Sequence, residues 1–428
     1  MTAHIITIGT ELLIGDTLNT NASWMGSLLT ENGLKCEKAI TVGDEPDQIL
    51  SVLDQSLKQA DLTVMTGGLG PTHDDITKKS LLAYFNVKMR RHEPTLQHVQ
   101  EYFKKRSLPF SKSNYDQADV PENCEVMHNA MGTAPGMWFP EYNLAVLPGV
   151  PPEMKYLMNQ EVVPRIKKLF PGTEDSYVRY FQLTGIGEST LNDLNLDGLS
   201  AYLSKNITLA FLPHASGMTL RINSREQDGE QVRKLEDYLR QKAGEYIYSE
   251  QKDEKLNLVV GRLLSEKKLT LSTAESCTGG FLANTVTDVP GSSAWFTGGI
   301  LPYSNTMKIN LLDVDKKMLE EYGAVSKQVA LQMARSAART LGSHLAVSTT
   351  GIAGPGGGSE AKPVGTVWVG YWSEQDHFAV KLNLFRDRLI NKERTSVIAL
   401  DLIRRRLLGI STLPYGLKPE YSRAPYKL

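Results

Sequence analysis

Apolar runs typical of strands alternate along the chain with segments whose apolar positions recur at helical spacing. Residues 4–9 predict a buried strand and residues 19–33 predict a helix. The same order follows at 62–68, a strand that ends in two glycines, and at 74–85, a helix. Residues 143–166 again combine a buried strand, a Pro/Gly turn and a helix. This alternation predicts a parallel sheet covered by helices.

The rest of the chain divides into three segments by the same pattern. Residues 171–250 predict a small α+β unit, with one helix near 189–203, whose shape resembles a KH-like domain. Residues 256–410, after a charged linker, return to alternating strands and helices. The Pro-rich residues 411–428 predict an extended arm outside the core. The predicted fold class is therefore α/β: two α/β domains with parallel or mixed sheets, the first at 1–170, joined by the small α+β domain.

The charge balance excludes several classes of protein. The 428 residues carry 47 Lys and Arg against 48 Asp and Glu, and 41% are apolar, which is typical of globular rather than disordered or fibrous chains. Proteins that neutralise many nucleic-acid phosphates normally carry a basic excess. Between residues 173 and 250, eight Lys and Arg stand against twelve Asp and Glu, and the GxxG with which KH domains clamp RNA is missing. We therefore expect no direct contact with nucleic acid.

Cysteine usage and hydropathy predict the cellular location. Cys36, Cys124 and Cys277 are far apart and lack CxxC spacing, so neither a disulfide framework nor a thiolate zinc site is indicated. The first residues lack the basic segment, apolar stretch and cleavage site of a signal peptide. No apolar run approaches the ~20 residues that span a bilayer. The pattern is typical of a cytoplasmic protein without a membrane contact.

A glycine-rich loop at 66–75 lies between a predicted strand and a predicted helix. Glycines let the backbone approach an anion closely, and the free N–H groups of a helix start point toward it. Asp74 and Asp75 suit a divalent cation that bridges carboxylates and phosphates. The alternative is that Thr72 and Asp75 form a capping box. Polar residues after the first strand favour a ligand site, because ligands gather at the carboxyl ends of parallel strands. These residues are Thr10, Glu11, Asp16 and Asn21.

Five segments carry a resemblance: IGTELLIGDTLNTN (8–21), TGGLGPTHDDITKKS (66–80), NYDQADVP (114–121), NAMGTAPG (129–136) and LPGVPPEM (147–154). Together they resemble the amino-terminal domain of the CinA family, which is similar to molybdopterin-binding domains. The resemblance implies cleavage of the pyrophosphate in ADP-ribose, to AMP and ribose 5-phosphate, with a divalent ion (Mg, Mn or Co) at Asp74 and Asp75. The nucleotide-binding positions that it implies are Glu11, Asn21, Gly67, Gly68, Gly70 and Thr72.

A second turn, AESCTGG (274–280), places Ser276 between a predicted strand and a predicted helix. A hydroxyl there lies beside the unpaired N–H groups of the first helical turn, which can stabilise a tetrahedral oxyanion. Helix starts rich in Ser and Thr are more often simple caps, so a nucleophile at this turn needs a base. The third region contains only His344 and His377, and neither lies in a recognisable motif.

The segment PYSNTMK (302–308) supplies a candidate base. Ser304 or Asn305 can cap a helix, which puts Tyr303 just before its start and Lys308 in its first turn. A lysine deprived of solvent loses its proton near neutral pH and can deprotonate a serine. The alternatives are a solvated surface lysine and a core tyrosine.

Two further segments could contact a phosphate. The glycine loop at 349–365 follows a predicted strand and offers backbone N–H groups, although a surface connection agrees equally well with its composition. The arginines of 386–394 could reach a phosphate, or they could lie on the solvent face of a helix.

These carboxy-terminal segments also match the family. ESCTGG, GSSAWFTGGILPYSNTMK (291–308), YGAVS (322–326), TGIAGPGGG and KPVGTV (362–367) resemble the CinA carboxy-terminal domain, the nicotinamide mononucleotide deamidase also found alone as PncC. Its Ser, Tyr and Lys fall on Ser276, Tyr303 and Lys308. The resemblance implies that this reaction uses no cofactor, and it suggests a homodimer. The oxyanion and substrate positions that it implies are Cys277, Thr278, Gly279, Gly280, Thr350, Gly351, Gly354 and Arg388.

Together the two resemblances predict a bifunctional enzyme of pyridine nucleotide recycling. The carboxy-terminal domain would hydrolyse nicotinamide mononucleotide to nicotinate mononucleotide and ammonia, and the amino-terminal domain would cleave ADP-ribose. Two other classes stay open. The amino-terminal domain could bind a nucleotide or pterin without hydrolysis, or the protein could be an interaction factor in DNA uptake, as the competence-related family name suggests.

Overall fold

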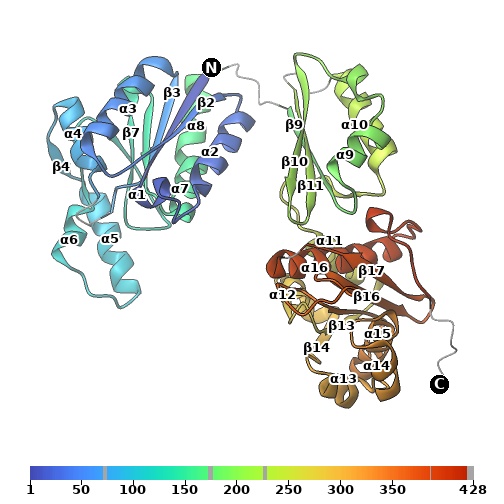
Figure 1. The fold of residues 1–428 in the computed structure, drawn as a ribbon. Helices are drawn as coiled ribbons and strands as arrows, with labels where there is room; N and C mark the ends of the chain where they lie inside the picture. Colours follow the sequence, from blue (N-terminus) through green and yellow to red (C-terminus); the bar gives the residue numbers. More distant parts are fainter. Residues whose placement is uncertain (71–74, 172–176, 225–228, 386, 422–428) are drawn as a thin grey trace. The chain divides into compact units, whose positions relative to one another are not determined.

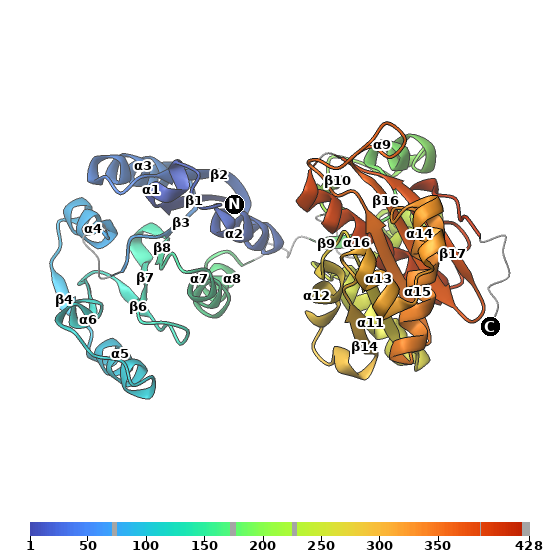
Figure 2. The same ribbon diagram turned by 60° about the horizontal axis from the view of Figure 1, so that its bottom comes forward.

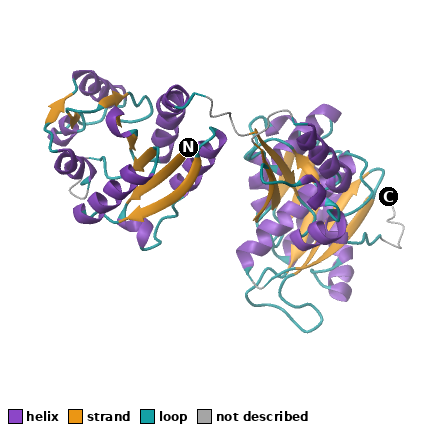
Figure 3. Ribbon diagram, turned by 90° about the horizontal axis from the view of Figure 1, so that it is seen from above, coloured by secondary structure: helices purple, strands orange, loops and turns teal. Residues whose placement is uncertain are grey.

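The computed structural model describes residues 1–70, 75–171, 177–224, 229–385 and 387–421, which form two compact units, Met1–Tyr177 and Val178–Leu428. Strands and helices alternate through most of both units (Figure 1, Figure 3). Among these described residues, no helix combines the length and the apolar character needed to cross a membrane.

The amino-terminal unit contains a six-stranded mixed sheet in the order β2-β1-β3-β8-β7-β6. Strands β2, β1, β3 and β8 run parallel, whereas β7 and β6 pair antiparallel to their neighbours. The bounds are β1 (Thr2–Ile8), β2 (Lys35–Val42), β3 (Leu62–Thr66), β6 (Glu125–Met127), β7 (Gly136–Phe139) and β8 (Leu144–Leu147). A separate antiparallel pair consists of β4 (Met89–Arg91) and β5 (Asp119–Pro121).

Helices cover both faces of this sheet because successive strand residues point to opposite sides. Ile5 packs in a core with α2 and α7, and the next residue, Ile6, packs in a second core with α3 and α4. The helices are α1 (Thr10–Leu13), α2 (Thr20–Glu31), α3 (Pro46–Gln59), α4 (Thr77–Phe85), α5 (Glu93–Lys105), α6 (Lys112–Asp116), α7 (Pro151–Leu157) and α8 (Val163–Leu169).

The second unit begins with a four-stranded sheet in the order β10-β11-β9-β12. Its strands are β9 (Tyr177–Leu183), β10 (Ile207–His214), β11 (Gly217–Ser224) and β12 (Ile247–Ser249). Helices α9 (Glu188–Thr190) and α10 (Glu230–Ala243) lie on one side of it (Figure 1). The single helix predicted near 189–203 is wrong: α9 continues as a π turn, Leu191–Asn195, and a separate 3-10 turn, Leu199–Tyr202. Gly198, which favours turns over helix, separates the two turns.

A five-stranded sheet forms the rest of the second unit, in the order β14-β13-β15-β16-β17. The strands are β13 (Leu271–Glu275), β14 (Phe296–Ile300), β15 (Leu345–Gly351), β16 (Thr366–Ser373) and β17 (His377–Asn383). One face packs against α11 (Leu256–Lys267), α12 (Phe281–Thr287) and α16 (Arg388–Leu407). The other packs against α13 (Asn305–Leu312), α14 (Lys316–Tyr322) and α15 (Lys327–Leu341), which Figure 2 shows in front of the sheet. The predicted α/β fold class is confirmed.

A buried ion cluster at the end of α16 ties the two sheets of the second unit together. Asp401 accepts hydrogen bonds from Arg404 Nε at 2.7 Å and from Arg405 Nε at 2.9 Å, and both arginine side chains are 0% exposed. Arg404 also donates to the backbone carbonyls of Glu245 (2.8 Å) and Ile247 (3.3 Å), beside β12. Buried charges are tolerated only when such partners satisfy them. This cluster, which we call the seam, therefore fixes how the end of α16 lies against the segment before β12.

The expectation that the carboxy-terminal arm lies outside the core is wrong for part of it. Leu413 is 5% exposed and belongs to the main core of the last sheet. Glu420 pairs with Ala379 of β17 as an isolated antiparallel bridge. The arm is held because apolar residues interrupt its polar sequence and find the open edge of the sheet.

Candidate active site

The Ser276 turn follows β13 directly. The chain leaves the sheet at Glu275, and Gly279 (φ +62°) and Gly280 (φ +89°) then adopt left-handed backbone conformations before α12 begins at Phe281. A side chain at either glycine would strain this backbone, so the glycines allow the sharp return that presents Ser276 at the end of the strand.

Glu275 fixes the turn from within, a role that the sequence analysis missed. Its carboxylate is buried and accepts from Thr278 Oγ1 (2.7 Å), Leu282 N (3.0 Å) and Ala283 N (2.7 Å). The carboxylate therefore caps the start of α12 in place of a residue at the usual capping position. The acid lies too far before the helix to match a capping-box spacing, and so no local pattern identifies it.

Lys308 lies directly against Ser276. Ser304, one of the two predicted caps, caps α13, and Lys308 in this helix is buried. Lys308 Nζ is 3.0 Å from Ser276 Oγ, and it donates to the backbone carbonyls of Pro302 (3.0 Å) and Tyr303 (3.2 Å). The alternative of a solvated surface lysine is therefore excluded.

The surroundings of Lys308 favour its neutral form. Burial lowers the pKa of Lys308. A neutral amine has two N–H groups and one lone pair. The two carbonyls of Pro302 and Tyr303 can take the N–H groups, which leaves the lone pair for the hydroxyl hydrogen of Ser276. The geometry is that of a base in contact with its nucleophile.

Tyr303 takes a different position from Lys308, although both belong to the same segment. Its side chain is 59% exposed, so it is not a core tyrosine. The Tyr303 hydroxyl accepts from Arg388 Nη2 at 3.1 Å, and Arg388 Nη1 donates to the carbonyl of Gly354 at 3.0 Å. Tyr303, Arg388 and Gly354 thus form a hydrogen-bonded group, which we call the rim of the site, while the direct neighbour of Ser276 is Lys308.

The backbone N–H groups of the turn are only partly available for an oxyanion. That of Ser276 donates to the Thr349 carbonyl (2.9 Å), and that of Gly279 donates to the Ser276 carbonyl (3.2 Å). Within the described part of the chain, the N–H groups of Cys277, Thr278 and Gly280 have no such backbone partner. The implied role of Gly279 as a backbone donor is therefore not supported, whereas the N–H groups of Cys277, Thr278 and Gly280 stay available for it.

Cys277 is poorly placed for chemistry. Its thiol is buried, and this burial raises the pKa of Cys277 to about 12. Because the thiolate is the reactive form of cysteine, Cys277 is inert near neutral pH. Of the two adjacent candidates, only Ser276 has a base within hydrogen-bonding distance.

The second glycine loop divides into structural and rim residues. Thr350 is buried and donates to the Ala324 carbonyl at 2.7 Å, and a Cβ on Gly351 would lie 2.6 Å from a methyl group of Val367. Both residues therefore contribute to the packing of β15.

Lys392 Nζ lies only 3.5 Å from where a Cβ on Gly279 would be. The side chain of Lys392, like that of Arg388, therefore reaches the surroundings of the Ser276 turn from α16.

The amino-terminal unit has its own pocket at the carboxyl ends of β1 and β3. It has a volume of about 130 Å³ and is lined by Glu11, Asn21 and Gly67 among others. Gly67 has φ +110°, and a Cβ there would lie 2.2 Å from the Ile8 carbonyl oxygen. Asn21 donates to the Gly149 carbonyl at 2.7 Å. The structure therefore brings three of the predicted nucleotide positions to one hollow.

The remaining predicted positions of this unit lie next to it in the chain. A Cβ on Gly68 would meet Thr77 Oγ1 at 2.3 Å, and one on Gly70 would meet Asp75 Oδ2 at 2.6 Å, so both glycines make room for the start of α4. Thr72 and Asp74 lie outside the described residues.

The donor chemistry of the amino-terminal unit fits a hard divalent cation only in part. The carboxylates of Asp75 and Glu11 are the oxygen ligands that Mg²⁺ prefers. Within the described ranges, no group of three His, Cys, Asp or Glu side chains is arranged to hold a metal ion. Mg²⁺ usually keeps several waters and binds through one or two carboxylates and substrate phosphates, so a partial set of protein ligands is compatible with it.

Comparison with known proteins shows similarity along most of the chain. Residues 4–168 match the family model described as "Probable molybdopterin binding domain", residues 178–249 match "Damage-inducible protein CinA KH domain", and residues 253–407 match "CinA C-terminal domain". The crystal structure of competence/damage inducible protein CihA from Agrobacterium tumefaciens is 35% identical, with a TM-score of 0.35, over 37% of this chain and 99% of that one.

Two relatives extend the similarity across all three segments. A CinA-like protein of Chloroherpeton thalassium is 42% identical over 95% of this chain and 99% of that protein. A CinA-like protein of Salinibacter ruber is 39% identical over 95% of this chain and 100% of that protein. The resemblance seen in the sequence motifs is confirmed, and this chain belongs to the CinA family.

Proposed function

We propose that the carboxy-terminal domain hydrolyses the amide of nicotinamide mononucleotide. The observation that carries the proposal is the 3.0 Å contact between Ser276 Oγ and the buried Lys308 Nζ, a nucleophile paired with a base of lowered pKa. The family resemblance supplies the substrate. This chemistry is of the hydrolase type, and the serine and its base together need no metal for it.

The reaction would proceed in two steps. Lys308 takes the hydroxyl proton of Ser276 as its oxygen attacks the carboxamide carbon, and the Thr278 and Gly280 N–H groups stabilise the oxyanion. Lys308 then returns the proton to the departing nitrogen, which leaves as ammonia. Water, deprotonated by the same amine, attacks the acyl-enzyme, so that nicotinate mononucleotide is released and Ser276 regains its proton.

Cations at the rim would position the nucleotide. Arg388 and Lys392 lie one helical turn apart at the start of α16, and Lys392 approaches the Ser276 turn. A guanidinium and an ammonium suit a phosphate monoester. Asp387 caps this helix through Leu389 N and Ile390 N, so the first helical N–H groups are already occupied and the side chains would make the phosphate contacts.

We propose that the amino-terminal unit cleaves the pyrophosphate of ADP-ribose. The pocket beside Glu11, Asn21 and Gly67 supports this, together with the oxygen donors near Asp75. A divalent cation would neutralise phosphate charge when bound. In this proposal Asn21 and the backbone around Gly67 orient the nucleotide, and Glu11 and Asp75 supply carboxylates.

One experiment tests both assignments. The purified full-length protein is given nicotinamide mononucleotide or ADP-ribose, each with and without EDTA, and ammonia and AMP are measured. We expect ammonia release to be insensitive to EDTA and AMP formation to depend on added Mg²⁺, Mn²⁺ or Co²⁺. Absence of ammonia release would refute the amidase. Absence of AMP formation at every metal tested would leave the amino-terminal unit as a nucleotide- or pterin-binding module.

A further inference from the structure

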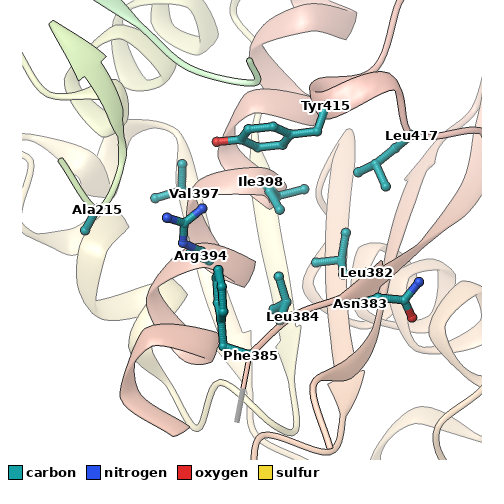
Figure 4. Close-up of a pocket in the computed structure, with 10 residues that line it drawn as sticks. All are labelled: Ala215, Leu382, Asn383, Leu384, Phe385, Arg394, Val397, Ile398, Tyr415 and Leu417. Atoms are coloured by element: carbon teal, nitrogen blue, oxygen red, sulfur yellow. The ribbon is translucent and has the colours of Figure 1, made fainter. Parts of the chain in front are cut away.

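A small cavity lies between the last strand, the middle of α16 and the carboxy-terminal segment (Figure 4). Its volume is about 200 Å³. The described residues that line it include none from the Ser276 turn and none from α13. It is therefore separate from the site proposed for amide hydrolysis.

Most of the cavity wall is apolar. Leu382 lies near the end of β17, Leu384 directly follows that strand, Ile398 comes from α16 and Leu417 comes from the carboxy-terminal segment. Figure 4 shows the ring of Tyr415 across from Leu382 and Leu384. Such a wall favours the flat apolar body of a ring over a polar or hydrated ligand.

One strong polar group interrupts this wall. The Arg394 guanidinium lies 5.2 Å from the centre of the Phe385 ring, beside which Figure 4 shows it. Among the ion pairs and side-chain hydrogen bonds of the described residues, none involves Arg394, whereas Arg404 and Arg405 of the same helix share the carboxylate of Asp401. A half-buried guanidinium without an anionic partner favours an anion.

The backbone at the cavity mouth is held in an uncommon conformation. Tyr415 has φ +54° and ψ +26°, the left-handed region that bulky residues rarely occupy. Its N–H donates to the Gly185 carbonyl at 2.6 Å, which holds the backbone in this conformation. Strained residues held by surrounding structure are frequent where a ligand is clamped.

We propose that this cavity binds a single-ring aromatic carboxylate. An apolar cavity of ~150 Å³ holds benzene, so the space here accommodates one ring and a carboxylate but not a nucleotide. The carboxylate would pair with the Arg394 fork and the ring would lie among Leu382, Ile398 and Leu417. Arg394 and Lys392 both belong to α16, so a ligand here would contact the helix that carries the proposed phosphate-binding cations.

Binding of benzoate to the full-length protein tests the proposal, with benzamide as the uncharged isostere. Isothermal titration should show one benzoate per chain, and benzamide should bind at least about 10-fold more weakly because it lacks the charge. Arg394→Gln should weaken benzoate binding by about the same factor and abolish the preference for benzoate. Arg394→Lys should retain part of it, and Arg233→Gln, an exposed arginine of α10, should change nothing.

Location is tested separately with 3-bromobenzoate, whose bromine gives an anomalous signal in crystals of the protein. A peak within the cavity beside Arg394 supports the proposal. A peak elsewhere, equal affinity for benzoate and benzamide, or benzoate binding that survives Arg394→Gln would overturn it. Leu417→Trp, which fills the cavity while keeping Arg394, should remove the binding of both compounds, so that loss of binding does not depend on one variant's folding.

Discussion

Replacing Lys308 by Met removes the proposed base while keeping a side chain of similar length. The side chain is 2% exposed, so the substitution stays within the packed interior. Lys308 Nζ is 3.0 Å from Ser276 Oγ, and the variant therefore loses the group that would accept the hydroxyl proton. The hydroxyl itself, the turn and the cations of α16 remain in place.

The size of the effect follows from the role of the amine. A positioned general base contributes about 10²- to 10⁴-fold to a rate, which corresponds to about 3–5 kcal/mol in the activation free energy. The variant also leaves the buried carbonyl of Pro302 and the partly buried carbonyl of Tyr303 without the donor they have in the native protein. Each such loss costs up to about 1–3 kcal/mol, partly offset because an amine no longer has to be buried and deprotonated.

The pH dependence has a defined sign. Burial lowers the pKa of Lys308, so the amine is deprotonated at a lower pH than an ordinary lysine. The rate should be full above that pKa and should fall as the pH drops through it. A guanidinium cannot accept a proton at working pH, so Lys308→Arg should fail almost as completely as Lys308→Met.

The assay is ammonia release from nicotinamide mononucleotide between pH 6 and 10, with folding checked by circular dichroism. Lys316→Met, at an exposed lysine of α14, is the matched control and should keep full activity. Tyr303→Phe should have an effect smaller than Lys308→Met, because its hydroxyl contacts Arg388. If Lys308→Arg kept substantial turnover, Lys308 would act as a fixed charge and the base would have to be Tyr303 or water.

Three further predictions concern other parts of the chain. Cys277→Ala should keep most ammonia release while Ser276→Ala abolishes it, because the pKa of Cys277 is raised to about 12; the reverse pattern would indicate a thiol mechanism. Burial lowers the pKa of Lys78 to about 8, so between pH 8 and 10.5 the unfolded chain binds this proton more tightly than the folded chain does. The free energy of unfolding of the wild type should therefore rise over this pH range by at most about 3 kcal/mol, measured relative to Lys78→Met. Asp401→Asn should destabilise the second unit by about 3–5 kcal/mol in denaturant unfolding, since two buried arginines lose their shared carboxylate; a change below 1 kcal/mol would contradict this.

Local patterns were sufficient to predict the strand and helix that flank Ser276, and they narrowed the cap of α13 to Ser304 or Asn305. The glycines after Ser276 and the Ser-Asn pair before Lys308 carry their conformational preferences in the residues themselves. The contact of Ser276 with Lys308 spans 32 residues, so the sequence offered Lys308 as a candidate base, with a surface lysine as the alternative, and the family resemblance favoured the pairing. The structure supplies the physical reason, because α13 packs beside the end of β13.

Other features depend on distant parts of the chain and were not predictable. Glu275 caps α12 only because the turn folds the helix back over the strand end. Arg388 reaches Tyr303 across 85 residues. Leu413 joins the core of the last sheet, which no property of a Pro-rich tail predicts. In each case tertiary packing decided what local preference left open.

The buried seam at the end of α16 has a consequence for how this protein can change over evolution. The hydrogen bonds that Arg404 sends across the seam end on the backbone carbonyls of Glu245 and Ile247. A carbonyl oxygen is present whichever side chain its residue carries, so substitutions there leave those bonds intact. Inserting or deleting one residue between α10 and β12 would move both oxygens out of reach. The positions of Glu245 and Ile247 should therefore accept many different side chains, whereas the segment between α10 and β12 should keep its length. Correlated substitutions between Arg404 and these two positions should be rare among relatives.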